Sequence, residues 1–90
     1  MSRTLIRRLI QTTADSILDA LTQLQYLRPH LRLDAALARL QESLALPAHA
    51  VQPTRQRLEL DPHTPIGRLR RTELIQLARA IERQSRHTER

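Results

Sequence analysis

The sequence predicts a small all-α domain built from three helices. Leu, Ile and Ala supply almost all of its apolar residues, and Tyr26 is its single aromatic side chain, so residues that favour strands are scarce. Apolar residues recur at helical spacing in three stretches, and prolines stand between these stretches. A chain of 90 residues forms one domain, which we place over residues 1–90.

The first stretch predicts one long helix over residues 2–28, with Ser2 as its N-cap. Pro29 ends this helix, because a proline disfavours helical geometry in the residue before it. Thr12 and Thr13 offer an alternative, in which the helix breaks and starts again at Asp15; one continuous helix is our interpretation. The packing seam of this stretch steps by four and three through Ile10, Ala14, Ile17, Leu21 and Leu24.

The second helix begins at Pro29 or Asp34 and ends at Pro47. Its short connection to the first helix predicts an antiparallel helical hairpin. Its seam consists of Leu33, Leu37, Leu40 and Leu44, with Ala36 beside it.

Residues 47–65 predict an irregular, proline-rich connector, because four of the five prolines lie there. One helical turn over residues 47–51 and a short extended segment over residues 57–60 fit within it. A helix-turn-helix over residues 35–58 is an alternative. Pro53 argues against it, because this proline would fall inside the second helix and break it. The turn glycine typical of that motif is also missing.

The third helix is predicted to begin at Pro65, after Thr64 as N-cap, and to reach about Ser85, with residues 86–90 as a frayed tail. At about 100° per residue it is amphipathic and basic on one side. Its arginines within an arc of roughly 60° are Arg68, Arg79, Arg83, Arg86 and Arg90. Its opposite, apolar side contains Ile66, Leu69, Leu74, Leu77, Ala80 and Ile81.

The net charge of +6 favours an acidic or phosphate-bearing partner. All fifteen basic residues are arginine, and a GC-rich genome explains that choice over lysine, so the sign of the charge is the more informative property. The first helix begins with Arg3, Arg7 and Arg8, where the helix dipole disfavours each exposed cation by roughly 0.3–1 kcal/mol. Two explanations are open: these arginines serve a function, or an exposed surface tolerates the cost.

These patterns predict a non-enzymatic binding protein, an accessory or regulatory factor that contacts the phosphate backbone of nucleic acid. DNA, RNA and an acidic protein surface all fit the charge. The residues expected to make the contacts are Arg3, Arg7, Arg8, Arg68, Arg71, Arg79, Arg83 and Arg86. The scarcity of aromatic residues argues against stacking on single-stranded bases.

The alternative function is a protein-interaction module: a homo-oligomer, a small subunit of an assembly, or an inhibitor of an acidic protein surface. In this case the apolar seams would form the interface. The seam residues are Ile10, Ile17, Leu21, Leu24, Leu33, Leu37, Leu40 and Leu44. A closed three-helix core is the competing use of the same side chains.

Other classes of function find no support in the composition. The chain has no cysteine, its four histidines have no metal-ligand spacing, and Gly67 is its only glycine, so no metal site, cofactor or glycine-rich phosphate loop is expected. Asp15 and Asp19 form a lone carboxylate pair, which is typical of a solvated surface rather than a catalytic site for a small-molecule substrate.

The sequence also predicts a location. No apolar run approaches the roughly 20 residues of a transmembrane helix, and the N-terminal stretch does not resemble a secretory signal. We therefore expect a cytoplasmic protein of bacterial, phage or plasmid origin. A transit peptide at the Arg-rich start is the alternative.

Overall fold

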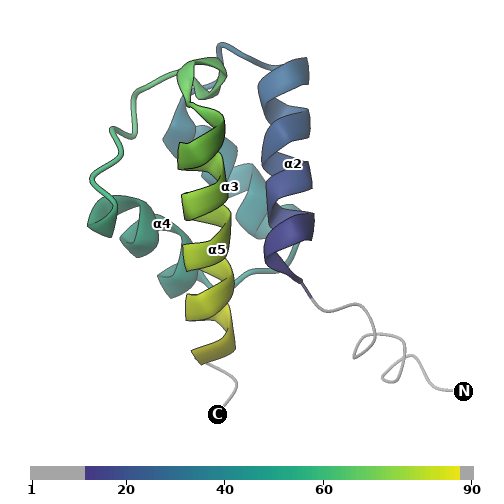
Figure 1. The fold of residues 1–90 in the computed structure, drawn as a ribbon, viewed down its shortest axis with the longest axis vertical. Coiled ribbons are helices and arrows are strands. Elements are labelled where there is room, and N and C mark those ends of the chain that lie inside the picture. The colour runs from purple at the N-terminus through teal and green to yellow at the C-terminus, as the bar shows by residue number, and fades with distance from the viewer. Residues whose placement is uncertain (1–11, 88–90) are drawn as a thin grey trace, which may run out of the picture.

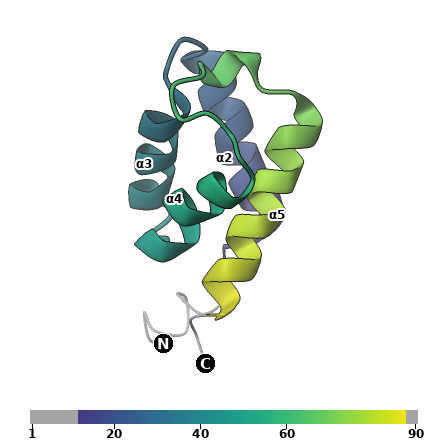
Figure 2. The ribbon, with the colours of Figure 1, turned by 90° about the vertical axis from the view of Figure 1, so that its left-hand side faces the viewer.

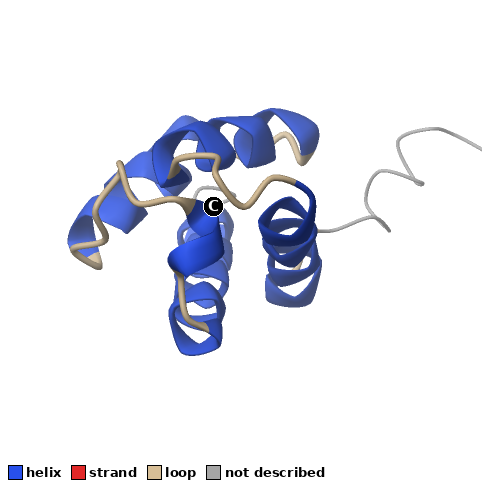
Figure 3. Cartoon of the chain, turned by 90° about the horizontal axis from the view of Figure 1, so that it is seen from above, coloured by secondary structure: helices blue, strands red, loops and turns tan. Residues whose placement is uncertain are grey.

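The computed structural model describes residues 12–87, and all its regular secondary structure is helical, with loops between the helices (Figures 1 and 3). The predicted all-α class is therefore confirmed for the described residues, which contain no strand. The elements are α2 (Ala14–Leu27), α3 (Leu33–Ser43), α4 (Ala48–Arg57), the 3₁₀ turn η1 (Ile66–Arg68) and α5 (Arg71–His87). The predictions that concern Arg3, Arg7, Arg8, Ile10 and Arg90 lie outside the described residues.

The helices α2 and α5 lie side by side and run in opposite directions (Figure 1). The helix α3 turns back against α2, and α4 runs across the space between α3 and α5 (Figure 2). The N-terminal end of α2 and the C-terminal end of α5 therefore share the lower end of the molecule in Figure 1. The end of α2 and the beginning of α5 share its upper end.

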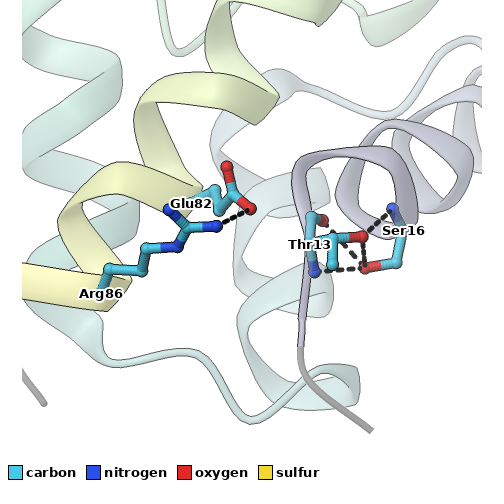
Figure 4. A network of polar contacts seen from close by, with 4 residues as sticks. All are labelled: Thr13, Ser16, Glu82 and Arg86. Carbon is cyan, nitrogen blue, oxygen red and sulfur yellow. Dashed lines mark hydrogen bonds and ion pairs between the residues drawn. The ribbon is translucent and has the colours of Figure 1, made fainter.

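The predicted continuous first helix is wrong at Thr13, where the chain is extended and α2 begins at the next residue. Thr13 and Ser16 form a capping box (Figure 4): Ser16 N donates to Thr13 Oγ1 (3.2 Å), and Thr13 N donates to Ser16 Oγ (2.9 Å). These bonds satisfy backbone donors at the helix start, which favours a new helix over a continuous one. The alternative restart considered at Asp15 lies one residue from the observed start. The predicted end before Pro29 is confirmed, because α2 ends at Leu27.

The predicted connector is wrong in its first half, because α4 occupies residues 48–57 and contains Pro53. The proline removes one hydrogen bond of the helix but does not end it. The helix instead gains stability by burying Ala50, Val51 and Thr54. A helix, a four-residue turn and a second helix therefore do form over residues 33–57, and the objection that Pro53 would break the second helix is wrong.

Both α3 and α4 end in a Schellman motif with a residue other than glycine in the left-handed conformation. Ala45 has φ 53° and Glu59 has φ 58°. Leu46 N donates to Gln41 O (2.9 Å), and Leu60 N donates to Arg55 O (3.2 Å), which are the long bonds of the motif. The predicted extended segment over residues 57–60 is thus a helix end.

The third predicted helix begins later than its sequence indicates. Residues 66–68 form η1, Leu69 is extended, and α5 runs from Arg71 to His87. The N-cap expected at Thr64 is absent, because the Thr64 carbonyl accepts from Leu33 N (2.9 Å) and Pro65 bridges to Arg32. Arg70 N donates to the Glu73 carboxylate (2.8 Å) at the actual start of the helix.

Two segments far apart in the sequence are joined by hydrogen bonds at the upper end of the molecule. We call this junction the loop clasp; it comprises residues 29–34, residues 62–69 and the side chain of Gln25. Gln25 Nε2 donates to the carbonyls of Ile66 and Leu69, both at 3.0 Å. The backbone bonds join Ile66 N to Leu31 O (2.7 Å), Gly67 N to Pro29 O (2.9 Å), Leu33 N to Thr64 O (2.9 Å) and Asp34 N to Pro62 O (3.0 Å).

The predicted interaction seam is the core of the domain itself. The side chains of Ile17, Leu21, Leu33, Leu37 and Leu40 are at most 1% exposed, and Leu24 and Leu44 pack half-buried against them. The described residues of the seam are thus covered by this chain itself, and Ile10 lies outside the described residues. On α5 the core contains Leu74, Leu77, Ala78 and Ile81, so Ala78 takes the place expected for Ala80.

Replacing Ala45 with glycine is expected to stabilise the domain by about 0.5–1 kcal/mol. Glycine relieves the cost of the left-handed conformation, and this gain exceeds the entropy that glycine adds to the unfolded chain. Glu59→Gly should act in the same direction. Ala38→Gly, at an exposed position inside α3, is the matched control and should destabilise by about 0.5–1 kcal/mol. Urea unfolding followed by circular dichroism measures all three; a destabilised Ala45→Gly would contradict the assignment.

Replacing Gly67 with alanine is expected to destabilise the domain by about 1–3 kcal/mol. The added Cβ would lie 2.8 Å from Pro29 Cβ and 2.9 Å from Pro29 O, so the loop clasp would have to open. The neighbouring Arg68→Ala, at an exposed position, should change stability by less than about 0.5 kcal/mol. Equal unfolding midpoints for the two variants would contradict this prediction, because the loop clasp would then accommodate the added Cβ without a loss of stability.

Candidate functional site

Positive charge is concentrated on α5 and the turn that precedes it. Residues 66–87 carry six arginines and two glutamates, whereas residues 12–65 carry five arginines and six carboxylates. The excess positive charge of the described chain therefore belongs to one helix and its approach, and these arginines form two groups at opposite ends of α5.

The lower cluster consists of Arg79, Arg83 and Arg86, which are all exposed. Their spacing of four and three residues places them within about 60° on one face of α5, as the sequence predicts. Together with Ala14 and Glu82 they line an open cleft of about 430 Å³ against the beginning of α2. Charged side chains dominate this lining, which suits an anionic group more than an apolar ligand.

One carboxylate enters the lower cluster. Glu82 Oε2 accepts from Arg86 Nη2 at 3.2 Å (Figure 4), in an exposed pair of the kind that contributes little to stability. Among residues 12–87, no carboxylate lies within ion-pair distance of Arg79 or Arg83. The side chains of Arg79 and Arg83 are therefore exposed without a counter-charge from the described chain.

The upper cluster consists of Arg28, Arg68, Arg70 and Arg71, which are exposed where α2 ends and α5 begins. The loop clasp brings them together, because it joins the chain after Arg28 to the chain around Arg68. Arg71 Nη1 also donates to Thr22 Oγ1 of α2, at 3.5 Å. Two large apolar side chains lie at the same end: Tyr26 is 84% exposed and Leu27 is 68% exposed.

The two clusters differ in the acidic residues around them. On α2, Asp15, Asp19, Thr22 and Tyr26 fall within an arc of about 60°. Because Thr22 contacts Arg71, this side of α2 borders α5. Asp15 and Asp19 lie toward the lower cluster, where they oppose its positive potential. At the upper end, Glu73 and Asp34 of the loop clasp each accept a backbone N–H, from Arg70 and Ala35 respectively.

The structure divides the arginine stripe predicted from the sequence. Arg79, Arg83 and Arg86 remain on one face, but Arg68 leaves it because α5 begins only at Arg71. Arg68 and Arg71 instead join the upper cluster. Sequence reasoning missed Arg28, Arg70, Tyr26 and Leu27. A signal for Tyr26 was available, because it falls on the same helical side as two aspartates rather than on the apolar seam.

Two further kinds of site find no support in the described chain. No three residues among His, Cys, Asp and Glu within residues 12–87 are placed so that they could hold a metal ion. None of the helices described here has both the length and the apolar character that a membrane crossing needs. No protein-family model matches the sequence, and comparisons with curated proteins and with solved structures find no match.

Proposed function

We propose that this chain is a non-enzymatic binding protein for polyanions, and for nucleic acid in particular. The observation that carries the proposal is the charge of residues 66–87: six arginines face two glutamates, and one of the six makes the only ion pair found among the described residues. Surface arginines on a domain without such a partner usually pair with local carboxylates or are balanced by them; here the excess is confined to one helix.

Guanidinium groups suit phosphate as a ligand. Each presents several N–H donors in a planar fork that matches two phosphate oxygens, and its charge persists at all physiological pH values. Contacts of this kind position a nucleic acid without reading its bases. An accessory or regulatory role that tolerates many sequences follows from this chemistry. A chain without cysteine also suits the reducing cytoplasm, where we place it, in a bacterial or phage setting.

The length of α5 is sufficient for several phosphate contacts. From Arg71 to Arg86 the helix rises about 22 Å at 1.5 Å per residue. One strand of a duplex advances about 3.4 Å along the axis per phosphate, so this distance corresponds to about six steps. The two clusters, near the ends of this span, can therefore hold separate phosphates of one strand.

A second candidate function is binding to another protein, including a second copy of this chain. The buried seams no longer support it, but the exposed Tyr26 and Leu27 do, because large apolar side chains at a basic surface are common anchors in protein interfaces. An acidic protein surface would suit the arginines around them.

Replacing both Arg79 and Arg83 with glutamine is expected to weaken duplex binding about equally for all sequences. Each lost phosphate contact should reduce the slope of log Kobs against log[salt] by about 0.9, so the double variant should lose about 1.8. Fluorescence anisotropy of a labelled duplex over a salt series measures both. The matched control replaces Arg39 and Arg57, exposed on α3 and α4, and should leave the slope unchanged. An unchanged slope in the α5 variant, or no binding by the parent chain at low salt, would contradict the proposal.

Replacing Asp19 with asparagine is expected to strengthen binding by about 1.5- to fivefold at low salt. The variant removes a negative charge from the side of α2 that borders α5, and a single exposed charge contributes roughly 0.2–1 kcal/mol. Glu42→Gln removes an exposed charge from α3 and should have a smaller effect. Equal gains from both variants would mean that net charge, rather than the α2–α5 side, governs binding.

A further inference from the structure

Tyr26 has no role in the core of this domain. It is the only aromatic residue of the chain, it lies in the last turn of α2, and 84% of its surface is exposed. The core is formed by Leu, Ile, Val and Ala side chains without it. An aromatic ring is among the side chains that gain most from burial, and the domain leaves this one uncovered.

Tyr26 lies on a helix that is held in place by hydrogen bonds, at a basic end of the molecule. The helix that carries it is tied to the start of α5 through the side chain of Gln25, its direct neighbour. Thr22, one helical turn before Tyr26 on the same side of α2, accepts a hydrogen bond from Arg71. Arg28 follows two residues later. The ring therefore lies one helical turn from a residue that Arg71 contacts, at the end of the molecule that carries the upper cluster.

We propose that the upper cluster is a contact site for an unpaired nucleobase, on which Tyr26 stacks while Arg71 and its neighbours bind the flanking phosphates. This inference rests on the proposed function and specifies its ligand as single-stranded nucleic acid. Proteins that bind single strands combine a basic track for the backbone with aromatic faces for the bases. The scarcity of aromatic residues seemed to exclude this mode, but one exposed ring is sufficient for one base.

An acidic peptide is the competing ligand, and two observations favour a nucleic acid strand. Beyond Arg71, the lower cluster extends from about 12 Å (Arg79) to about 22 Å (Arg86) further along α5, so a charged backbone that follows this helix from the upper cluster reaches it. A nucleic acid strand carries a charge and a flat base at each step, whatever its sequence. A peptide would need an apolar side chain at one defined point and carboxylates on both sides of it.

The chain provides its own reporter for this contact. Tyr26 is the only tyrosine and there is no tryptophan, so the intrinsic fluorescence of the full chain comes from Tyr26 alone. We expect saturable quenching by an oligothymidylate, because stacking brings the base onto the ring. Inorganic polyphosphate, which has the charge but no base, should bind in competition with a labelled oligonucleotide and leave the emission intensity largely unchanged.

Substitutions of Tyr26 test the contribution of the ring to binding separately from that of the positive charge. Tyr26→Ala should weaken binding of the oligothymidylate by about 5- to 150-fold, the equivalent of roughly 1–3 kcal/mol for one stacked base, and should leave polyphosphate binding unchanged. Tyr26→Phe keeps the ring and should bind as the parent chain does. Tyr26→Leu keeps apolar surface without a flat face and should behave as the alanine variant. Leu27→Ala is the matched control, because it removes the exposed apolar side chain next to Tyr26 and leaves the ring in place.

The outcomes distinguish this inference from the proposed function. If neither polyphosphate nor the oligonucleotide binds, both fail. If both ligands bind, and either the emission of Tyr26 does not respond to the oligonucleotide or Tyr26→Ala binds it as tightly as the parent chain, only the stacking site is refuted. Polyglutamate that binds and quenches as strongly as the oligothymidylate would overturn the inference in favour of an acidic protein.

Discussion

The loop clasp is the constraint on which the rest of this structure depends. Four backbone hydrogen bonds and two from the Gln25 side chain join residues 25–34 to residues 62–69, across 28 to 44 positions of sequence. These bonds satisfy backbone groups that the irregular chain between helices would otherwise leave without partners. They also fix the beginning of α5 against the end of α2. The antiparallel pairing of these two helices, and with it the side of α5 that faces solvent, follows from this junction together with the apolar stripe of Leu74, Leu77 and Ile81.

The clasp also gives the two arginine clusters different surroundings. At the lower end, the first turn of α2 brings Asp15 close to the cleft, and Glu82 pairs with Arg86. At the upper end, the clasp gathers arginines from the end of α2, from η1 and from the start of α5, and Glu73 is occupied by a backbone N–H. The surroundings of the two clusters therefore differ, and the exposed ring lies at the end where arginines from three segments of the chain meet.

Helical periodicity predicted the core well and the element boundaries poorly, for one physical reason. A seam such as Leu33, Leu37 and Leu40 sums the preference of many residues to be buried, so the error of any single position matters little. A boundary depends on a few local hydrogen bonds. Thr13 with Ser16 starts α2, the pairing of Thr64 with Leu33 removes the N-cap expected at Thr64, and Ala45 and Glu59 end helices without a glycine. Pro53 remained inside a helix because α4 buries three neighbours of it, which periodicity could not reveal in so short a segment.

Of the candidate site, the face shared by Arg79, Arg83 and Arg86 was predictable from helical spacing. The upper cluster was not, because its arginines are brought to one end of the molecule by the loop clasp.

Two local costs coincide at the upper end of the molecule. Arg70 and Arg71 stand at the first positions of α5, where the helix dipole disfavours a cation by roughly 0.3–1 kcal/mol in exposed surroundings, and Glu73 offsets this only in part. Tyr26 leaves a large apolar surface in water a short distance away. Neither feature is needed by the core, which closes without them. Exposed arginines improve solubility, but an exposed ring does not. Features that contradict local rules of stability tend to be retained where they serve a function. Their occurrence at one end, rather than spread over the surface, is the strongest argument that this end meets a ligand that is both anionic and flat.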